Sequence, residues 1–308
     1  MTQSPNTQFY PASTIEVDTH QNGQRLDNFL MAQFRELPKA RIYQMIRKGE
    51  VRINKGRAKP TSRLQTGDIV RLPPVKIEVK ATVDIPESAW NRLKKSILFE
   101  NDNFLIIDKP SGLAVHAGSE IPYGIIETLK AFGQHDFYEL VQRLDRDTSG
   151  LLLIAKNGKT LRELQQQDLV RQYTLIVAGN WAQKFPQKTT VITDLLDTEH
   201  RINGERHVII SPNGKAAETH FTLIESGNHA SILQAILKTG RTHQIRVHSS
   251  GNGFPLLGDR RYHPQDPSNT ERLALHATEL HFNLFGESFS FNSPMPQSLM
   301  NIFNRLNA

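Results

Sequence analysis

Residues 141–156, VQRLDRDTSGLLLIAK, place two carboxylates, Asp145 and Asp147, beside the arginines Arg143 and Arg146. An ionised carboxylate can act as a nucleophile or a general base at neutral pH, and neighbouring arginines favour its charged form. The Thr-Ser-Gly that follows indicates a turn, and the apolar run LLLIA indicates a central strand. A loop held by a rigid strand is a common position for a catalytic group. A structural Arg–Asp contact within the turn fits the same spacing, so the residues alone leave both interpretations open.

A second polar cluster is TGRTHQIRVH, residues 239–248. Read as a strand, it places Gln244, Arg246 and His248 on one face, which would line a polar site. His243 and His248 are five positions apart, which does not match the i, i+4 pair of a helical zinc site. We therefore expect no metal here.

A third feature is Tyr173, which precedes the apolar strand TLIVAG. An aromatic ring at a strand entrance can stack on a nucleic-acid base. A tyrosine in this position also fits a role in the core, and its sequence context alone does not exclude that role.

Charge is unevenly distributed along the 308 residues, which carry a net charge of +6. Residues 39–63 hold nine Lys or Arg and one acid, a net charge of +8, so the rest of the chain is near −2. Such a cluster favours a polyanionic partner. The chain contains no cysteine, which excludes disulfides and thiolate chemistry. No apolar run approaches the roughly 18 residues of a membrane span, and we expect a cytoplasmic protein without a membrane partner.

The basic cluster lies within a pattern of two short helices and a hairpin. A helix is expected from Gln24, with Leu26, Phe29, Leu30 and Phe34 on one face, and a second from Lys39 to Lys48, capped by Gly49. The segments QRLDNFLMAQF, KARIYQMIRKGEVRINKGRA and LQTGDIVRL resemble an S4 RNA-binding domain. The resemblance implies that a basic face contacts RNA phosphates, with Arg41, Lys48, Arg52, Lys55 and Arg57 as the candidate RNA-binding residues.

The predicted organisation is a flexible tail over residues 1–14, the S4 domain and the start of a linker over 15–80, and a larger domain over 90–308. In the larger domain, short strands such as ILFE, FLIID, GLLLIAK, YTLIVAG, ASILQAIL and ELHF alternate irregularly with the helical stretches GIIETLKAF and KTLRELQQQDL. This mixture favours an α+β fold.

Five segments of the larger domain together resemble the RluA family of pseudouridine synthases. They are DKPSGLAVHAG (108–118), QRLDRDTSGLLLIAK (142–156), RQYTLIVAG (171–179), TGRTHQIRVHSSGNGFPLLGD (239–259) and LALHATELHF (273–282). With the S4 domain, the resemblance is strongest to the RluC branch, which acts on 23S ribosomal RNA. The implied fold is a mixed, largely antiparallel sheet around a central cleft.

The resemblance also implies residue roles. Asp145 is the expected catalytic residue, Arg246 the arginine that pairs with it, and Tyr173 the ring that stacks on the target uracil. Arg143 would open and hold the RNA. The family usually has histidine where this chain has Gln142, which affects local RNA contacts more than chemistry.

The implied reaction isomerises uridine to pseudouridine in RNA after base flipping, without a cofactor or metal. Asp145 would either attack C1′ or remove the 2′ proton, and the sequence does not decide between these. The expected partner is 23S ribosomal RNA or a large-subunit precursor, bound by a monomer. Three alternatives stay open: a non-catalytic ribosome-assembly factor, a synthase acting on other ribosomal or transfer RNA uridines, and a hydrolase that uses Asp145 and Asp147 as a carboxylate pair.

Overall fold

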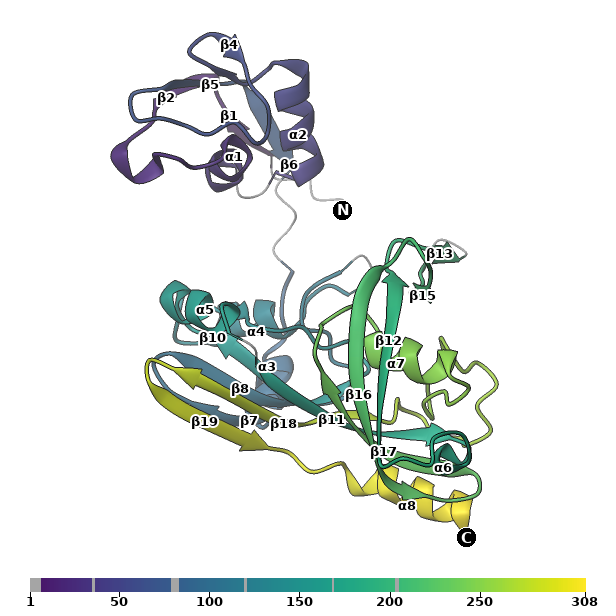
Figure 1. Cartoon of the computed structure of the whole chain (residues 1–308). Coiled ribbons are helices and arrows are strands. Elements are labelled where there is room, and N and C mark those ends of the chain that lie inside the picture. Colours follow the sequence, from purple (N-terminus) through teal and green to yellow (C-terminus); the bar gives the residue numbers. More distant parts are fainter. Residues whose placement is uncertain (1–6, 35–36, 79–82, 119–120, 168, 203–204) are drawn as a thin grey trace, which may run out of the picture. The chain divides into compact units, whose positions relative to one another are not determined.

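A computed structural model describes residues 7–34, 37–78, 83–118, 121–167, 169–202 and 205–308. The chain divides into two compact units between Val83 and Asp84 (Figure 1). The division falls between the two domains predicted from the sequence, 15–80 and 90–308. We refer to residues 1–83 as the N-terminal unit and to residues 84–308 as the C-terminal unit.

The N-terminal unit packs two helices against a small sheet, as the sequence predicted. The helices are α1 (Leu26–Gln33) and α2 (Lys39–Lys48). The sheet has the order β2 (Ser13–Glu16), β5 (Ile69–Leu72), β3 (Arg52–Ile53) and β4 (Gly56–Arg57), and a short 3-10 helix, η1, covers Thr19–Gln21. Helix α2 has the predicted bounds, and Gly49 ends it in the left-handed region with φ 71°.

The predicted tail is wrong for part of residues 7–14. Strand β1 (Thr7–Tyr10) pairs antiparallel with β6 (Val75–Glu78), and β2 begins at Ser13. The ring of Tyr10 packs edge-on against Phe34 at 5.6 Å between centroids. A four-residue strand is too short to give a clear periodic signal. The partner that stabilises it lies 65 residues away in the sequence, with Tyr10 opposite Val75. Residues 1–6 lie outside the described part of the chain.

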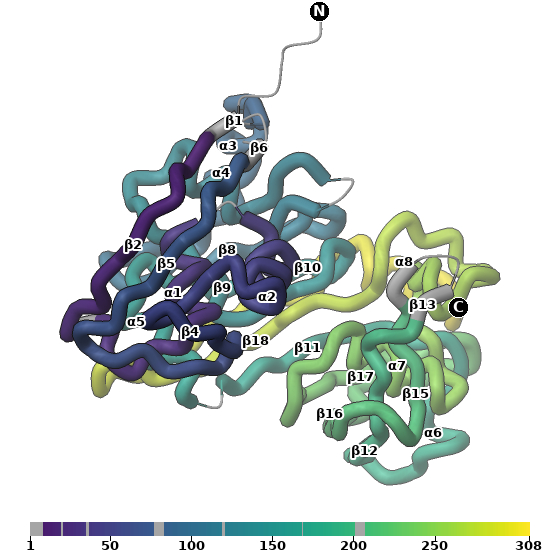
Figure 2. The backbone as a smooth tube through the Cα atoms, turned by 90° about the horizontal axis from the view of Figure 1, so that it is seen from above, coloured from purple at the N-terminus to yellow at the C-terminus, as the bar shows by residue number. Residues whose placement is uncertain are grey.

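The C-terminal unit is built on one large mixed sheet (Figures 1 and 2). Its order is β15 (Ile209–Ile210), β12 (Thr189–Asp197), β16 (Lys215–Ser226), β17 (Ala230–Leu237), β11 (Val170–Ala178), β18 (Leu275–Leu284), β10 (Ser149–Ala155), β8 (Phe104–Lys109) and β7 (Ile97–Glu100). Strand β19 (Glu287–Asn292) pairs with β18, and β9 (Glu139–Leu140) pairs with β10. Strands β13 (Arg201–Ile202) and β14 (Glu205–Arg206) form a separate hairpin. Among the described strands, β10 and β18 form the parallel pair, and the other pairs are antiparallel. The predicted α+β class with a mixed, largely antiparallel sheet is confirmed.

Six helices accompany this sheet in the described residues: α3 (Glu87–Lys94), α4 (Ile125–Phe132), α5 (Gly158–Gln165), α6 (Trp181–Lys184), α7 (Gln244–Gly251) and α8 (Gln297–Asn307). Helices α4 and α5 were predicted, whereas α3 was not, and it crosses the predicted start of the larger domain at residue 90. Helix α3 belongs to the folded unit because Ala89 and Leu93, one turn apart, are buried and Trp90 stacks on Phe132 of α4. None of the helices in the described residues has the length and apolar character needed to cross a membrane.

The strand expected over residues 239–248 is wrong, because residues 244–251 form helix α7. Gln244 to Ser249 are all buried, so α7 has no solvent-exposed polar stripe that would reveal a helical period. On α7, Gln244 and His248 are four positions apart and share one helical face, whereas Arg246 lies on the other side of the helix.

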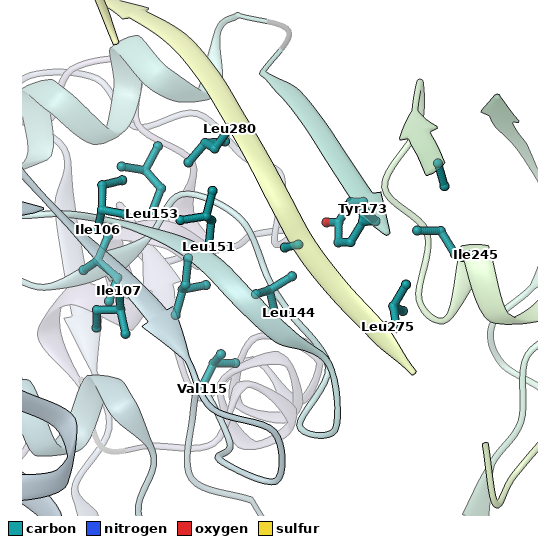
Figure 3. Close-up of a cluster of buried hydrophobic side chains, with 14 of the residues drawn as sticks. Ile106, Ile107, Val115, Leu144, Leu151, Leu153, Tyr173, Ile245, Leu275 and Leu280 are labelled. Carbon is teal, nitrogen blue, oxygen red and sulfur yellow. The ribbon is translucent and has the colours of Figure 1, made fainter. Parts of the chain in front are cut away.

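The core beneath the sheet holds these elements in place. Figure 3 shows Ile106 and Ile107 of β8 beside Leu151 and Leu153 of β10, with Leu280 of β18 close by. Strand β10 is buried over its whole length, since both neighbouring strands and both faces are covered. The loop that enters β10 is therefore attached to one of the most firmly packed elements of the unit.

Candidate active site

The loop that carries Asp145 enters the sheet at its parallel pair. Strand β10 pairs with β18 over Ser149–His276 and Gly150–Ala277, and Ala277 is also the register partner of Tyr173 on β11. Gly150 has φ 104°, and a Cβ at this position would collide with the backbone of Ala277. Only glycine fits this position without strain, so the Ser-Gly of the sequence motif aligns the Asp145 loop with Tyr173.

A buried lysine, Lys109, also holds the loop that carries Asp145. Lys109 is fully buried, and its Nζ donates to the carbonyls of Pro110 (3.0 Å), Leu113 (2.9 Å) and Arg146 (2.8 Å). Burial lowers the pKa of Lys109 to about 7, while the nearby carboxylates of Asp147 and Asp145 favour its charged form. An ammonium group has three donors, and here each has an acceptor. The backbone next to Asp145 is therefore fixed by direct contacts.

The carboxylate of Asp145 faces two partners from the start of α7. The Nη1 of Arg246 lies 3.5 Å from Oδ2 of Asp145, and the Nε2 of His243 lies 3.7 Å from the same oxygen. The Asp145 side chain keeps 31% of its surface exposed, whereas Arg246 keeps 7%. Asp145 is thus reachable from solvent although the groups that face it are buried.

Arg246 is itself positioned by a second aspartate. Its Nε and Nη2 donate to the two oxygens of Asp259 at 2.8 and 2.7 Å, and the Asp259 side chain is fully buried. Burial acts to lower the pKa of Arg246, but the hydrogen bonds and charge of Asp259 outweigh it and raise that pKa above its usual value. The bidentate pair fixes the guanidinium plane, which leaves Nη1 to face Asp145.

These groups open onto a cavity of about 380 Å³ whose lining includes Arg143, Asp145, Tyr173, His243 and Arg246. Figure 3 shows Tyr173 beside β18, with Leu275 and Ile245 around it. Burial raises the pKa of Tyr173 to about 12, and the charge of Asp145 acts in the same direction. The tyrosine is therefore a neutral phenol at pH 7. An ionised carboxylate, a fixed arginine and an aromatic ring thus meet in one polar cavity.

Comparison with known proteins decides the family. Residues 103–250 match the family model described as RNA pseudouridylate synthase, and residues 24–70 match the S4 domain model. The chain is 41% identical over 307 residues to "Ribosomal large subunit pseudouridine synthase C" of Haemophilus influenzae, which covers 95% of this chain and 94% of the relative. This chain belongs to the RNA pseudouridylate synthase family.

Further relatives agree with this family assignment. The protein of the same name from Vibrio cholerae is 43% identical over 283 residues, covering 87% of this synthase and 88% of the relative. A solved structure, "Human RNA Pseudouridylate Synthase Domain Containing 4", superimposes with a TM-score of 0.58 at 21% identity, covering 71% of this chain and 95% of that one. At that identity the structural likeness shows the fold alone.

In this synthase, the four residues predicted for the C-terminal site lie together. Asp145, Arg246, Tyr173 and Arg143 all line the cavity. Arg143 is exposed, while Tyr173 is buried to 4% exposure. Gln142 is also buried in the cavity wall, and within the described residues its Oε1 has no hydrogen-bond partner.

The five predicted RNA-binding residues of the S4 domain differ in availability. Arg41 donates to Glu50 through Nη2 at 2.9 Å and is half-buried. Arg52 is exposed, with its guanidinium donating to the carbonyls of Gly49 and Lys55 at 3.3 Å each. The side chains of Lys48, Lys55 and Arg57 are exposed. Lys48 and Arg57 are thus more available to a phosphate than Arg41.

Sequence reasoning missed three residues that contact the Asp145 loop, its carboxylate or the arginine that faces it. Lys109 and Asp259 lay in the segments DKPSG and LLGD, which were used only as marks of resemblance. His243 was considered only as a metal ligand. No local signal pairs Asp259 with Arg246, because they are 13 residues apart and joined through a loop.

Proposed function

We propose that this protein isomerises uridines to pseudouridine in large-subunit (23S) ribosomal RNA, with Asp145 as the catalytic group. The observation that carries the proposal is the cavity in which the partly exposed Asp145 carboxylate meets Arg246 at 3.5 Å and the ring of Tyr173. The names of the relatives, which print the ribosomal large subunit, support the choice of RNA.

The reaction exchanges one bond to the ribose for another. The bond from C1′ to N1 breaks, the uracil rotates, and C1′ joins C5, while the hydrogen leaves C5 and N1 takes up a proton. No electrons enter or leave, so no redox partner is required. Asp145 acts on the sugar, either at C1′ or at the 2′ proton. Arg246 faces this carboxylate with a positive charge 3.5 Å away and can hold it in place for the reaction.

The target nucleotide must leave the helical stack to reach the cavity. In the proposal, the flipped uracil stacks on Tyr173, whose buried hydroxyl stays protonated at pH 7. Arg143, which is exposed at the rim of the same cavity, holds the RNA from which the base departs. The enzyme would hold one strand by phosphate contacts and one base by stacking.

The basic segment of the S4 domain supplies sequence-independent RNA affinity. It carries the net charge of +8 over residues 39–63, and phosphate neutralisation by such residues dominates affinity for nucleic acids. We take the enzyme to act as a monomer in the cytoplasm, and light scattering of the purified protein measures the first point.

The decisive experiment replaces Asp145 and compares the loss with a matched change at Asp147. Asp145→Asn keeps the size of the side chain and removes its charge. We expect the rate of pseudouridine formation to fall at least about 1,000-fold while RNA affinity persists. Asp147→Asn should retain activity within a few-fold, because the Asp147 side chain is 48% exposed and its ion pair with the adjacent Arg146, at 3.3 Å, lies at the surface.

Full activity of Asp145→Asn would contradict the assignment. Absence of pseudouridine formation by the wild-type enzyme on ribosomal RNA would instead favour a non-catalytic assembly factor. Mapping pseudouridines in ribosomal and transfer RNA from a deletion strain separates the large-subunit substrate from other RNA substrates of the same family.

A further inference from the structure

His243 lies between the candidate catalytic carboxylate and a buried tyrosine. Its Nδ1 is 2.8 Å from the hydroxyl of Tyr262, and its Nε2 is 3.7 Å from Oδ2 of Asp145. Its backbone, at φ 53° and ψ 20°, is in the left-handed region immediately before α7. Histidine adopts this region more readily than bulky apolar residues do. One ring edge thus faces Tyr262 and the other faces Asp145.

The direction of the hydrogen bonds follows from the contacts of Tyr262. Its hydroxyl oxygen accepts from the backbone N–H of Val208 at 3.2 Å. The single hydroxyl hydrogen of Tyr262 is then available for Nδ1 of His243. Burial lowers the pKa of His243 well below its usual value, so the ring is neutral at pH 7 and carries one proton. If Nδ1 accepts, that proton is on Nε2 and points at Asp145.

The opposite tautomer is electrostatically unfavourable. With the proton on Nδ1, the lone pair of Nε2 would face the ionised carboxylate of Asp145, and two acceptors would oppose each other. The tyrosine is also well placed to donate, because burial raises its pKa and keeps it protonated. Its backbone N–H donates to Asp259 at 3.1 Å, and the guanidinium of Arg246 lies over its ring at 5.1 Å. The aspartate that holds Arg246 therefore also holds Tyr262.

We propose that His243 is a positioning residue for the isomerisation. The backbone N–H of Val208 donates to the Tyr262 hydroxyl, and that hydroxyl donates to Nδ1 of His243. These two hydrogen bonds fix the tautomer of His243 that presents Nε2–H to Oδ2 of Asp145. Arg246 and His243 both make their closest approach to that oxygen, so Oδ1 is the oxygen presented to the ribose. Contacts of this kind tighten when a substrate closes the site. The proposal rests on the catalytic role proposed for Asp145.

Two variants and one spectrum test it. Tyr262→Phe keeps the ring and removes only the hydroxyl, whereas His243→Asn tolerates the left-handed backbone but is too short to reach Asp145. We expect each to lower kcat about 10- to 100-fold with KM for a ribosomal RNA fragment unchanged within about twofold. Tyr10→Phe, whose ring packs on Phe34 in the N-terminal unit, is the matched control and should leave both constants unchanged.

The spectrum reports the tautomer directly. In wild-type protein labelled with ¹⁵N-histidine, the His243 signals, identified by their loss in His243→Asn, should show the proton on Nε2. In Tyr262→Phe the Nδ1-protonated fraction should rise. A merely structural hydroxyl would not move this population. If His243→Asn fails to fold, as circular dichroism would show, the Tyr262→Phe kinetics and spectrum still carry the test.

The outcomes separate the two proposals. The role of His243 is overturned if kcat is unchanged in both variants, or if the wild-type His243 ring is protonated on Nδ1. This conclusion requires that Asp145→Asn is inactive in the same assay. An active Asp145→Asn removes the catalytic role of Asp145 instead, and with it the reason for positioning that carboxylate.

Discussion

Asp27 in the S4 domain and Asp145 in the synthase domain both lie beside an arginine, but their carboxylates are engaged differently. Asp27 is 1% exposed and accepts from Arg25 at 3.0 and 2.6 Å, from the hydroxyl of Tyr43 at 3.0 Å, and from the backbone N–H of Asn28 at 2.9 Å. Asp145 is 31% exposed, and its closest charged neighbour, Arg246, is at 3.5 Å.

The difference shows how one residue type serves two purposes. The hydrogen bond from Arg25 lowers the pKa of Asp27, with burial acting against it, and each of its acceptor positions is used within the domain. A carboxylate satisfied in this way stabilises a fold but has nothing left for a substrate. In the synthase domain the carboxylate with the short hydrogen bonds is Asp259, which accepts both from Arg246. Asp145 has only the longer contact of 3.5 Å with Arg246 and keeps part of its surface exposed. The short hydrogen bonds of Arg246 are thus made to Asp259, and not to Asp145, the proposed catalytic carboxylate.

The largest expected effect comes from removing the arginine of each cluster. Arg246→Met leaves Asp259 buried without its partner, which should cost about 3–5 kcal/mol of unfolding free energy and should abolish activity. Arg25→Met should cost less, because the Arg25 side chain is 40% exposed and Asp27 would keep its hydrogen bonds from Tyr43 and Asn28. Urea unfolding with hydrogen exchange resolved by domain measures both. Equal losses in the two domains would contradict the distinction drawn between the clusters.

Lowering the pH should destabilise the two domains over different pH ranges. Each titrating group should change the free energy of unfolding by less than the arginine substitutions do. Burial lowers the pKa values of His243, His248 and His276 in the synthase domain. Below about pH 6.5 the unfolded chain therefore binds more protons than the folded one, and stability falls as pH falls, by at most about 1.4 kcal/mol per pH unit and group. The lowered pKa of Asp27 gives stability that is complete above its unfolded value of 3.8 and is lost only as pH falls through the folded value.

Hydrogen exchange at pH 7, 6 and 5 tests this difference. Protection should decrease in the synthase domain first, while the S4 domain stays protected until the pH approaches 4. Simultaneous loss at pH 6 would mean that buried histidines do not set the acid stability of the synthase domain.

The smallest effect concerns RNA affinity and sharpens the comparison within the S4 domain. Neutralising Lys48 or Arg57, which are exposed, should reduce the slope of log affinity against log salt by about 0.7–0.9 for each phosphate that the protein no longer neutralises. Arg41→Gln should change it less, because Glu50 already occupies its guanidinium at 2.9 Å. Filter binding at several salt concentrations measures the slopes, and a larger reduction for Arg41→Gln would mean that RNA displaces Glu50 from this arginine.

The sequence predicted well the elements that carry their own signal. Helix α2 has one apolar face and a terminal glycine at position 49, and strand β10 is an unbroken apolar run. Helix α7 was predicted as a strand because burial on all sides removes its period. Arg246 could be named from resemblance, whereas its dependence on Asp259 could not, since a loop decides which carboxylate the guanidinium meets. The role proposed for His243 depends on a left-handed backbone and a tyrosine 19 residues away, which no local pattern encodes.

The short parallel pairing at Gly150 affects how the two halves of the large sheet are held in register. The sheet behaves as two antiparallel leaves joined by a seam two residue pairs long, Ser149–His276 and Gly150–Ala277. So short a seam gives the backbone little resistance to sliding of one leaf past the other. Phe104 of one leaf packs against Phe282, Phe289 and Phe291 of the other, at centroid distances of 5.2, 4.9 and 6.1 Å. The spacing between the Asp145 loop on one leaf and Tyr173 on the other therefore depends on these aromatic contacts outside the cavity as well as on the close pairing at Gly150.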